Sequence, residues 1–199
     1  MELAGQYAYA GREWVARKVV SILGGQELEL VHNHHNFAWR EKHWGEEYIV
    51  VRKGATPAFP GQKGFIGGSM GDDAVIVQGA NQNDEDTLRL QEQAFFSTVH
   101  GAGRVMGRAE AIKGKVVGFD DKKRAIRDQS TRIRPEMQQE WLARKGVILR
   151  GGGLDESPHA YRRLPEVLDA QGSTIEVLHT LRPLVVVMAG ANGFDPYKD

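Results

Sequence analysis

The sequence predicts an α+β fold, in which helices and short strands occupy separate stretches of one chain. Two observations predict it: apolar side chains recur at helical spacing near the N-terminus, and short apolar runs bounded by glycine recur further along. A composition of 41% hydrophobic and 26% charged residues over 199 positions is typical of a folded domain. Neither a repeat nor a clear linker divides the chain, so residues 1–199 are treated as one segment.

A helix is predicted at the N-terminus. Leu3, Tyr7, Ala10 and Trp14 recur at spacings of four, three and four residues, which places them on one helical face. The glycine pair at 24–25 ends this helix. Further helices are expected at 105–112, 135–145 and 165–170, with a loop and short helix over 81–93.

Strands are expected where short apolar runs lie between turn residues. The run at 28–31 predicts a short strand, 48–51 a buried strand, 74–78 another strand, and 184–187 a last buried strand. Glycine-containing loops are expected at 67–71, 97–103 and 151–153, and a turn-rich segment at 56–64.

Composition excludes several kinds of chemistry. The chain has no cysteine, which excludes disulfides, thiolate metal sites and cysteine nucleophiles within it. Neither a membrane-length apolar run nor a signal peptide is present, so no membrane partner and a cytoplasmic location are expected. The formal net charge of zero argues mildly against a non-specific nucleic-acid binder. Basic clusters at 122–124 and 127–134 remain candidates for a local patch, although a solvated helix face is the commoner explanation of such clusters.

Three histidines follow the first expected strand: His32, His34 and His35, with Asn36 directly after them. Imidazole is the commonest metal ligand in proteins, so the cluster favours a metal site over isolated polar residues. A His-x-His pair at a strand end also occurs in metal-dependent hydrolases. That alternative requires further histidines and aspartates downstream, and the remaining histidines are scattered.

A second candidate site is the run from His100 to Arg104. Gly101, Ala102 and Gly103 follow His100, and small residues let the backbone approach a phosphate closely. A neutral imidazole beside such a loop can act as a nucleophile on phosphorus. The alternative is a tight loop with an incidental histidine. The glycine loop at 67–71 is a second, weaker candidate for phosphate binding.

Taken together, these segments resemble the RtcB family of RNA ligases both in their amino-acid sequences and in their order along the chain. The matching segments are 4–10, His35-Asn36, 51–55, 68–71, 100–104, 160–161 and 181–184. The resemblance covers nearly all of this sequence but only about the second half of a family member. It implies the C-terminal portion of an RtcB-like fold, with a further N-terminal half expected elsewhere.

The resemblance implies a GTP- and manganese-dependent RNA ligase active in tRNA splicing or RNA repair. A 2',3'-cyclic phosphate is opened to a 3'-phosphate, GMP passes from a histidine to that phosphate, and a 5'-hydroxyl displaces GMP. By this resemblance, His100 is the nucleophile, His35 a Mn2+ ligand and Asn36 a nucleotide contact. Tyr161 lies near the guanine pocket. Two loops bind the guanylate, and they consist of Gly67, Gly68, Ser69 and Met70 and of His100, Gly101, Ala102 and Gly103.

Several positions depart from the family pattern. Gly67 replaces a proline, Ala74 replaces a serine that contacts the nucleotide, and Met188 replaces a lysine that contacts the guanine or the guanylate. A tail at 190–199 runs past the usual end of the family. The aspartate, cysteine and two histidines that complete the family's two-manganese site belong to its N-terminal half. Two readings stay open: a ligase part completed by a separate N-terminal ligase half, or a catalytically inactive remnant.

Overall fold

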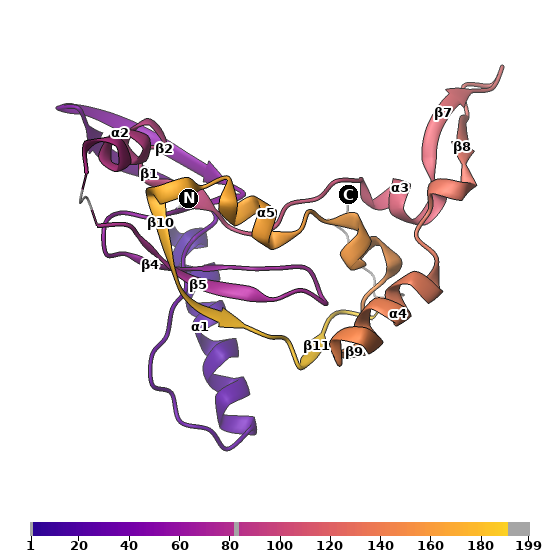
Figure 1. Cartoon of the computed structure of the whole chain (residues 1–199), viewed down its shortest axis with the longest axis horizontal. Coiled ribbons are helices and arrows are strands. Elements are labelled where there is room, and N and C mark those ends of the chain that lie inside the picture. Colours follow the sequence, from indigo (N-terminus) through magenta and orange to yellow (C-terminus); the bar gives the residue numbers. More distant parts are fainter. Residues whose placement is uncertain (1, 82–83, 191–199) are drawn as a thin grey trace. The chain divides into compact units, whose positions relative to one another are not determined.

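Two structural units share this chain, and segments distant in the sequence build each of them (Figure 1). The computed structural model describes residues 2–81 and 84–190. Unit 1 comprises Met1–Ile66, Val75–Gly101 and Asp169–Thr180, whereas unit 2 comprises Gly67–Ala74, Ala102–Leu168 and Leu181–Asp199. The chain passes between the units at Ile66–Gly67 and again at Gly101–Ala102, inside the two glycine loops rather than at a linker.

The helices follow the local signals of the sequence closely. Their bounds are α1 Glu2–Ile22, α2 Glu85–Gln93, α3 Arg108–Lys113, α4 Pro135–Lys145 and α5 Leu164–Asp169. Helix α4 starts at a proline, whose fixed φ suits the first helical turn, and ends at Gly146 in the left-handed conformation. The apolar stripe of α1 is largely solvent-exposed within the described residues: Leu3 is 80% and Trp14 66% exposed.

The strands form several small sheets. Their bounds are β1 Asn36–His43, β2 Glu46–Lys53, β3 Ala55–Pro57, β4 Lys63–Ile66, β5 Ala74–Gly79, β6 Ser97–Val99, β7 Lys115–Phe119, β8 Ala125–Asp128, β9 Ile148–Arg150, β10 Ile175–Leu181 and β11 Val185–Val187. Strands β1 and β2, β3 and β6, and β7 and β8 form antiparallel pairs; β11 lies parallel to β9; β5 lies between β10 and β4. Helices together with small sheets confirm the α+β expectation.

Some strand predictions were wrong. Residues 28–31 form no strand, and the expected loop at 97–103 begins with strand β6. Residues 48–51 do lie in β2, but they are mostly exposed because β2 pairs only with β1 in a two-stranded hairpin. Strand β11 is likewise mostly exposed. Strands β1, β3, β4, β7, β8, β9 and β10 were not predicted either, and most of them are too short to show a clear alternation.

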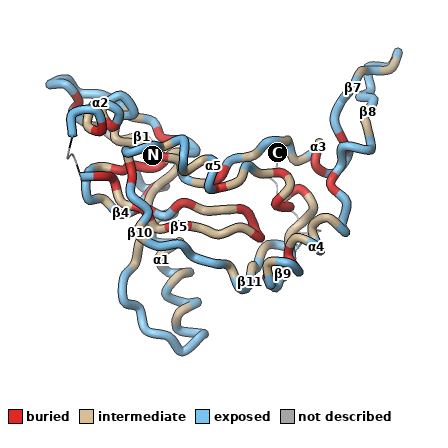
Figure 2. The backbone as a smooth tube through the Cα atoms, in the orientation of Figure 1, coloured by how far each residue is buried: buried red, intermediate tan, exposed pale blue. Residues whose placement is uncertain are grey.

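The buried residues lie in separate groups (Figure 2). In unit 1, alternate residues of β4 and β5 are buried, including Ile66 and Val77. Unit 2 contains two apolar clusters. One joins Met70, Leu142 and Val147 with Leu149, Val186 and Met188, and the other joins Ala111, Ile133 and Ala160 with Met106, Leu154 and Tyr161.

No helix within residues 2–81 and 84–190 is both long and apolar enough to cross a bilayer. The tail expected at 190–199 lies outside the described residues from position 191 onward.

Candidate functional site

Unit 1 brings His35 and His100 together, although 65 positions separate them in the sequence. Gly54 holds both backbones: its N–H donates to the His35 carbonyl at 2.9 Å, and its carbonyl accepts from the His100 N–H at 3.4 Å. The two imidazole rings stack with centroids 5.2 Å apart and planes 13° apart. Gly54 has a φ of +73°, which a side-chain-bearing residue adopts only with strain.

His32, His34 and His35 are partly buried, whereas His100 is exposed. Burial lowers the pKa of His35, and the charges of His100 and Arg12 lower it further. Burial and Arg12 likewise lower the pKa of His32 and of His34. At neutral pH these imidazoles are therefore uncharged, the form in which a ring nitrogen can bind a metal.

A cavity of about 270 Å³ lies beside the paired rings in unit 1. Its lining residues are Arg12, Val31, His32, Asn33, His35, Thr56, Phe65 and His100. Four of these carry buried polar atoms that have no hydrogen-bond partner among the described residues: Arg12 Nε and Nη2, His32 Nδ1, Asn33 Oδ1 and Thr56 Oγ1. Leaving one such group unsatisfied costs about 1–3 kcal/mol, so a polar ligand in this cavity would be stabilised.

Sequence reasoning assigned no role to Arg12 or Thr56. Arg12 lies on α1, and the packing of α1 against β1 brings it to the histidines. At Gly5 that packing is so close that an added Cβ would lie 2.3 Å from the Phe37 ring. A neighbouring hollow of about 240 Å³ is lined by Arg12, His35 and Asn36 with Ala4, Gly5, Ala8, His34 and Phe37. Asn36 thus shares a hollow with His35 but does not line the cavity beside His100.

The described residues do not complete a metal site. They contain no group of three or more His, Asp or Glu side chains placed to hold a metal ion. The rings of His32 and His34 instead lie 3.7 and 5.0 Å from the Tyr9 ring, and His34 also stacks on Phe37. Within residues 2–81 and 84–190, His32, His34 and His35 therefore do not form a metal site by themselves. One imidazole gives little affinity for Mn2+, which stands low in the Irving–Williams order.

In unit 2, the two glycine loops contact each other through their backbones. The Ala102 N–H donates to the Gly67 carbonyl at 3.0 Å. Gly68 packs against the backbone so closely that an added Cβ would lie 2.2 Å from the Asp73 carbonyl oxygen. Gly103 has a φ of +74°, and its carbonyl accepts from the Arg162 N–H at 2.9 Å. Position 68 therefore requires glycine because a Cβ would not fit there, and position 103 favours glycine because its φ is positive.

The side chains of the first loop are engaged within the protein. The Ser69 hydroxyl donates to the Asp72 carboxylate at 2.8 Å, and Arg163 donates to the same oxygen at 3.0 Å. Met70 is buried in the apolar cluster, and its sulfur accepts from Gln138 at 3.3 Å. Any ligand of this loop would consequently meet backbone atoms rather than these side chains.

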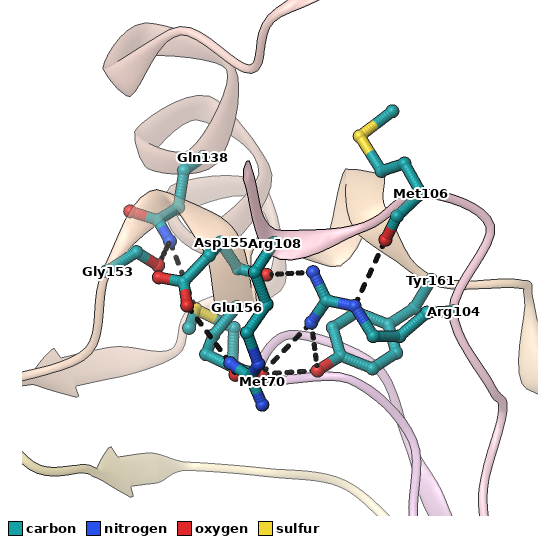
Figure 3. Close-up of polar contacts among 9 residues, drawn as sticks. All are labelled: Met70, Arg104, Met106, Arg108, Gln138, Gly153, Asp155, Glu156 and Tyr161. Carbon is teal, nitrogen blue, oxygen red and sulfur yellow. Dashed lines mark hydrogen bonds and ion pairs between the residues drawn. The ribbon is translucent and has the colours of Figure 1, made fainter. Parts of the chain in front are cut away.

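Tyr161 is held in a network of charged side chains (Figure 3). Its hydroxyl accepts from Arg104 Nη1 at 2.9 Å and donates to Glu156, while the Arg104 guanidinium lies 4.8 Å above its ring. Arg104 also donates to the Asp155 carbonyl at 2.6 Å, and Arg108 pairs with both Asp155 and Glu156. Burial raises the pKa of Tyr161 and the bond to Glu156 raises it further, so the phenol stays protonated.

This network gives Arg104 a position that the sequence did not predict. Arg104 ends the loop that begins at His100, and its contacts tie that end to the core of unit 2. Arg108 and Glu156, which complete the network, carried no recognisable signal in the sequence.

Two of the departures from the family pattern, Met188 and Ala74, have different surroundings. Met188 packs against the Met70 cluster, and its backbone N–H donates to the Arg150 carbonyl at 2.8 Å. Its sulfur lies 3.3 Å from the point where a Cβ on Gly152 would stand. Ala74 begins strand β5, at the point where the chain leaves unit 2.

Comparison with known proteins identifies close relatives. The model of the family described as tRNA-splicing ligase RtcB matches residues 1–189. The RNA-splicing ligase RtcB of Escherichia coli strain K12 is 37% identical over 160 residues, covering 80% of this chain and 33% of the relative. The tRNA-splicing ligase RtcB of Archaeoglobus fulgidus is 31% identical over 218 residues, covering 94% of this chain and 40% of the relative. The chain thus spans between a third and two fifths of the length of these relatives.

Proposed function

Since this chain belongs to the RtcB family of RNA ligases, we propose that it supplies the nucleotide-carrying part of an enzyme that joins RNA 3'-phosphate or 2',3'-cyclic phosphate ends to 5'-hydroxyl ends. The observation that carries the proposal is the position of His100. Its backbone is fixed through Gly54, and it lines a cavity together with Arg12, whose buried Nε and Nη2 atoms have no hydrogen-bond partner among the described residues.

In this proposal a ring nitrogen of His100 attacks the α-phosphorus of GTP. A nitrogen–phosphorus bond forms, the bond from that phosphorus to the bridging oxygen of the β-phosphate breaks, and pyrophosphate leaves. The positive charge of Arg12 would stabilise negative charge that develops on the phosphoryl oxygens in the cavity. His35, stacked beside His100, keeps the attacking ring in place.

The later steps return the imidazole to its free form. An oxygen of the RNA 3'-phosphate attacks the guanylate phosphorus, and the nitrogen–phosphorus bond to His100 breaks. The 5'-hydroxyl oxygen of the second RNA end then attacks the 3'-phosphorus, loses its proton, and expels GMP. By resemblance to the family, the loops at 67–70 and 102–103 would contact the guanylate through backbone N–H groups, and Tyr161 would contact the guanine.

Manganese binding would require ligands from a second polypeptide. His35 would be one ligand, and the described residues do not provide a full set of ligands around it. We therefore expect a separate N-terminal ligase half to supply the other Mn2+ ligands.

A catalytically inactive remnant is the second candidate. Met188 favours it, because a thioether packed in the Met70 cluster cannot make the charged contact that the family's lysine makes. The metal-dependent hydrolase alternative gains no support from residues 2–81 and 84–190, which lack a cluster of three metal-binding side chains.

Labelling of the chain with α-labelled GTP separates these candidates. Incubation with Mn2+ and the N-terminal half of the E. coli relative should give an acid-labile, alkali-stable adduct, as a phosphoramidate does. His100→Ala and His100→Asn should abolish the adduct. His179→Asn, at an exposed histidine of β10, is the matched control and should label normally. The chain by itself should not join RNA ends. Labelling that survives in both His100 variants, or ligation by the chain alone, would contradict the proposal.

A further inference from the structure

Positive charge is concentrated in the segment that forms the β7–β8 hairpin and its base. Residues 113–134 hold eight basic and three acidic side chains, although the whole chain has a formal net charge of zero. The hairpin projects away from α3 and α4 within unit 2 (Figure 1). The hairpin itself, from Lys115 to Asp128, holds five basic and three acidic side chains, and the flanking residues add three basic ones. Such a concentration of positive charge favours phosphate binding.

Two of the three acidic side chains are used inside the hairpin. The Asp120 carboxylate accepts from the backbone N–H groups of Lys122 and Arg124 and pairs with the Arg124 guanidinium at 2.7 Å. The Asp128 carboxylate accepts from the backbone N–H and hydroxyl of Ser130. These contacts shape the turn and leave the amines at its tip free. Within the described part of the chain, no ion pair includes Lys115, Lys122 or Lys123.

Hydrogen bonds join the two ends of the hairpin at its base. The Lys115 N–H donates to the Thr131 hydroxyl at 2.7 Å, and Arg127 donates to the Gly114 carbonyl at 2.8 Å. Gly114 has a φ of +82°, and an added Cβ there would lie 2.0 Å from the Asp128 carbonyl oxygen. An element held in this way loses little conformational entropy when it binds a partner.

The hairpin also presents an exposed aromatic ring. The register pairs Val116 with Arg127 and Phe119 with Ala125, which puts Phe119 and Arg127 on the same face. The side chain of Phe119 is 68% exposed. A basic surface with an exposed aromatic ring matches single-stranded nucleic acid, because an unpaired base can stack on the ring while lysines contact its phosphates.

We propose that the β7–β8 hairpin binds a single-stranded stretch of RNA, with Lys122 and Lys123 on phosphates and Phe119 stacked on a base. The choice of RNA rests on the proposed ligase function. The hairpin would bind RNA in the absence of GTP, Mn2+ or chemistry at His100.

The test is fluorescence anisotropy with the full chain and a labelled 12-nucleotide single-stranded RNA, without GTP or metal, at several salt concentrations. Lys122→Gln/Lys123→Gln should weaken binding and reduce the slope of log affinity against log salt by about 1.4, at ~0.7 for each lost phosphate contact. Phe119→Ala should weaken binding at least about fivefold through lost stacking. Unchanged circular dichroism would verify that each variant is folded.

Lys18→Gln/Lys42→Gln is the matched control, since it removes two exposed charges outside the hairpin and should leave the affinity near that of the wild type. The hairpin variants should still be labelled by α-labelled GTP as the wild type is, which distinguishes failure of this inference from failure of the ligase proposal. Three outcomes would overturn the inference: no RNA binding by the chain, equal losses in hairpin and control variants, or tighter binding of duplex RNA that is insensitive to Phe119→Ala. Binding of phosphatidylserine vesicles in place of RNA would overturn it as well.

Discussion

Replacing Arg52 by alanine should be among the most damaging single changes in unit 1. The Arg52 side chain is 1% exposed and donates to both Glu41 carboxylate oxygens, at 2.6 and 3.0 Å. It also donates to the Ser97 hydroxyl at 2.8 Å and to the Phe95 carbonyl at 2.7 Å. These bonds join the β1–β2 hairpin to the segment that leads into β6 and His100.

The expected loss in the free energy of unfolding follows from these contacts. Removing one partner of a buried ion pair costs about 3–5 kcal/mol, because the remaining charge stays buried without compensation. The free energy of unfolding of an ordinary domain is about 5–15 kcal/mol in total. Arg52→Ala should therefore lose a large part of the stability of unit 1. The double variant Glu41→Gln/Arg52→Met should lose less stability than the sum of the losses in Glu41→Gln and in Arg52→Met.

The effect depends on pH in a defined direction. Burial opposes ionisation of Glu41, but hydrogen bonds from Arg52 and His43 outweigh it and hold the pKa of this carboxyl below its ordinary value. A folded pKa below the unfolded one stabilises the protein above the unfolded value, about 4.3 for glutamate, and this stabilisation is lost as the pH falls through the folded pKa. The difference between wild type and Arg52→Ala should thus shrink in acid below about pH 4.

Urea unfolding followed by tryptophan fluorescence measures this directly, since Trp39 lies 4.9 Å from the Arg52 guanidinium. Arg52→Lys serves as a comparison, because it keeps the charge and loses the paired contacts with Glu41. A loss below about 1 kcal/mol in Arg52→Ala at pH 7, or strict additivity in the double variant, would refute this account of the ion pair.

Two further changes test unit 2, both by thermal unfolding. Gly68→Ala places a Cβ against the Asp73 carbonyl oxygen and should destabilise the protein by about 1–3 kcal/mol; an unchanged midpoint would show that the loop moves freely. Tyr161→Phe removes the hydroxyl that joins Arg104 to Glu156 and should cost about 1–3 kcal/mol. Equal stability of Tyr161→Phe and wild type would mean that water or the remaining ion pair replaces this hydroxyl.

The site was predictable from the sequence only in part. Two separate motifs singled out His35 and His100, and the structure places their rings 5.2 Å apart. Arg12 was not predictable, because its role depends on α1 packing against β1. Met70 was expected to contact the guanylate, whereas its side chain lies in the apolar core. The roles of His35 and His100 in metal binding and in catalysis remain predictions.

The sequence by itself determined the family and the helices whose signals are local. A helix was expected around 135–145, and α4 spans Pro135–Lys145, with a proline at its start and a glycine at its end. Only the tertiary structure decided which strands pair and which polar side chains meet. Arg52 and Ser97 are 45 positions apart, and Thr87 and Ser173 are 86 apart. The physical reason is that a helix forms its hydrogen bonds within a few residues, whereas a sheet, a buried ion pair and a cavity depend on partners that folding brings from elsewhere.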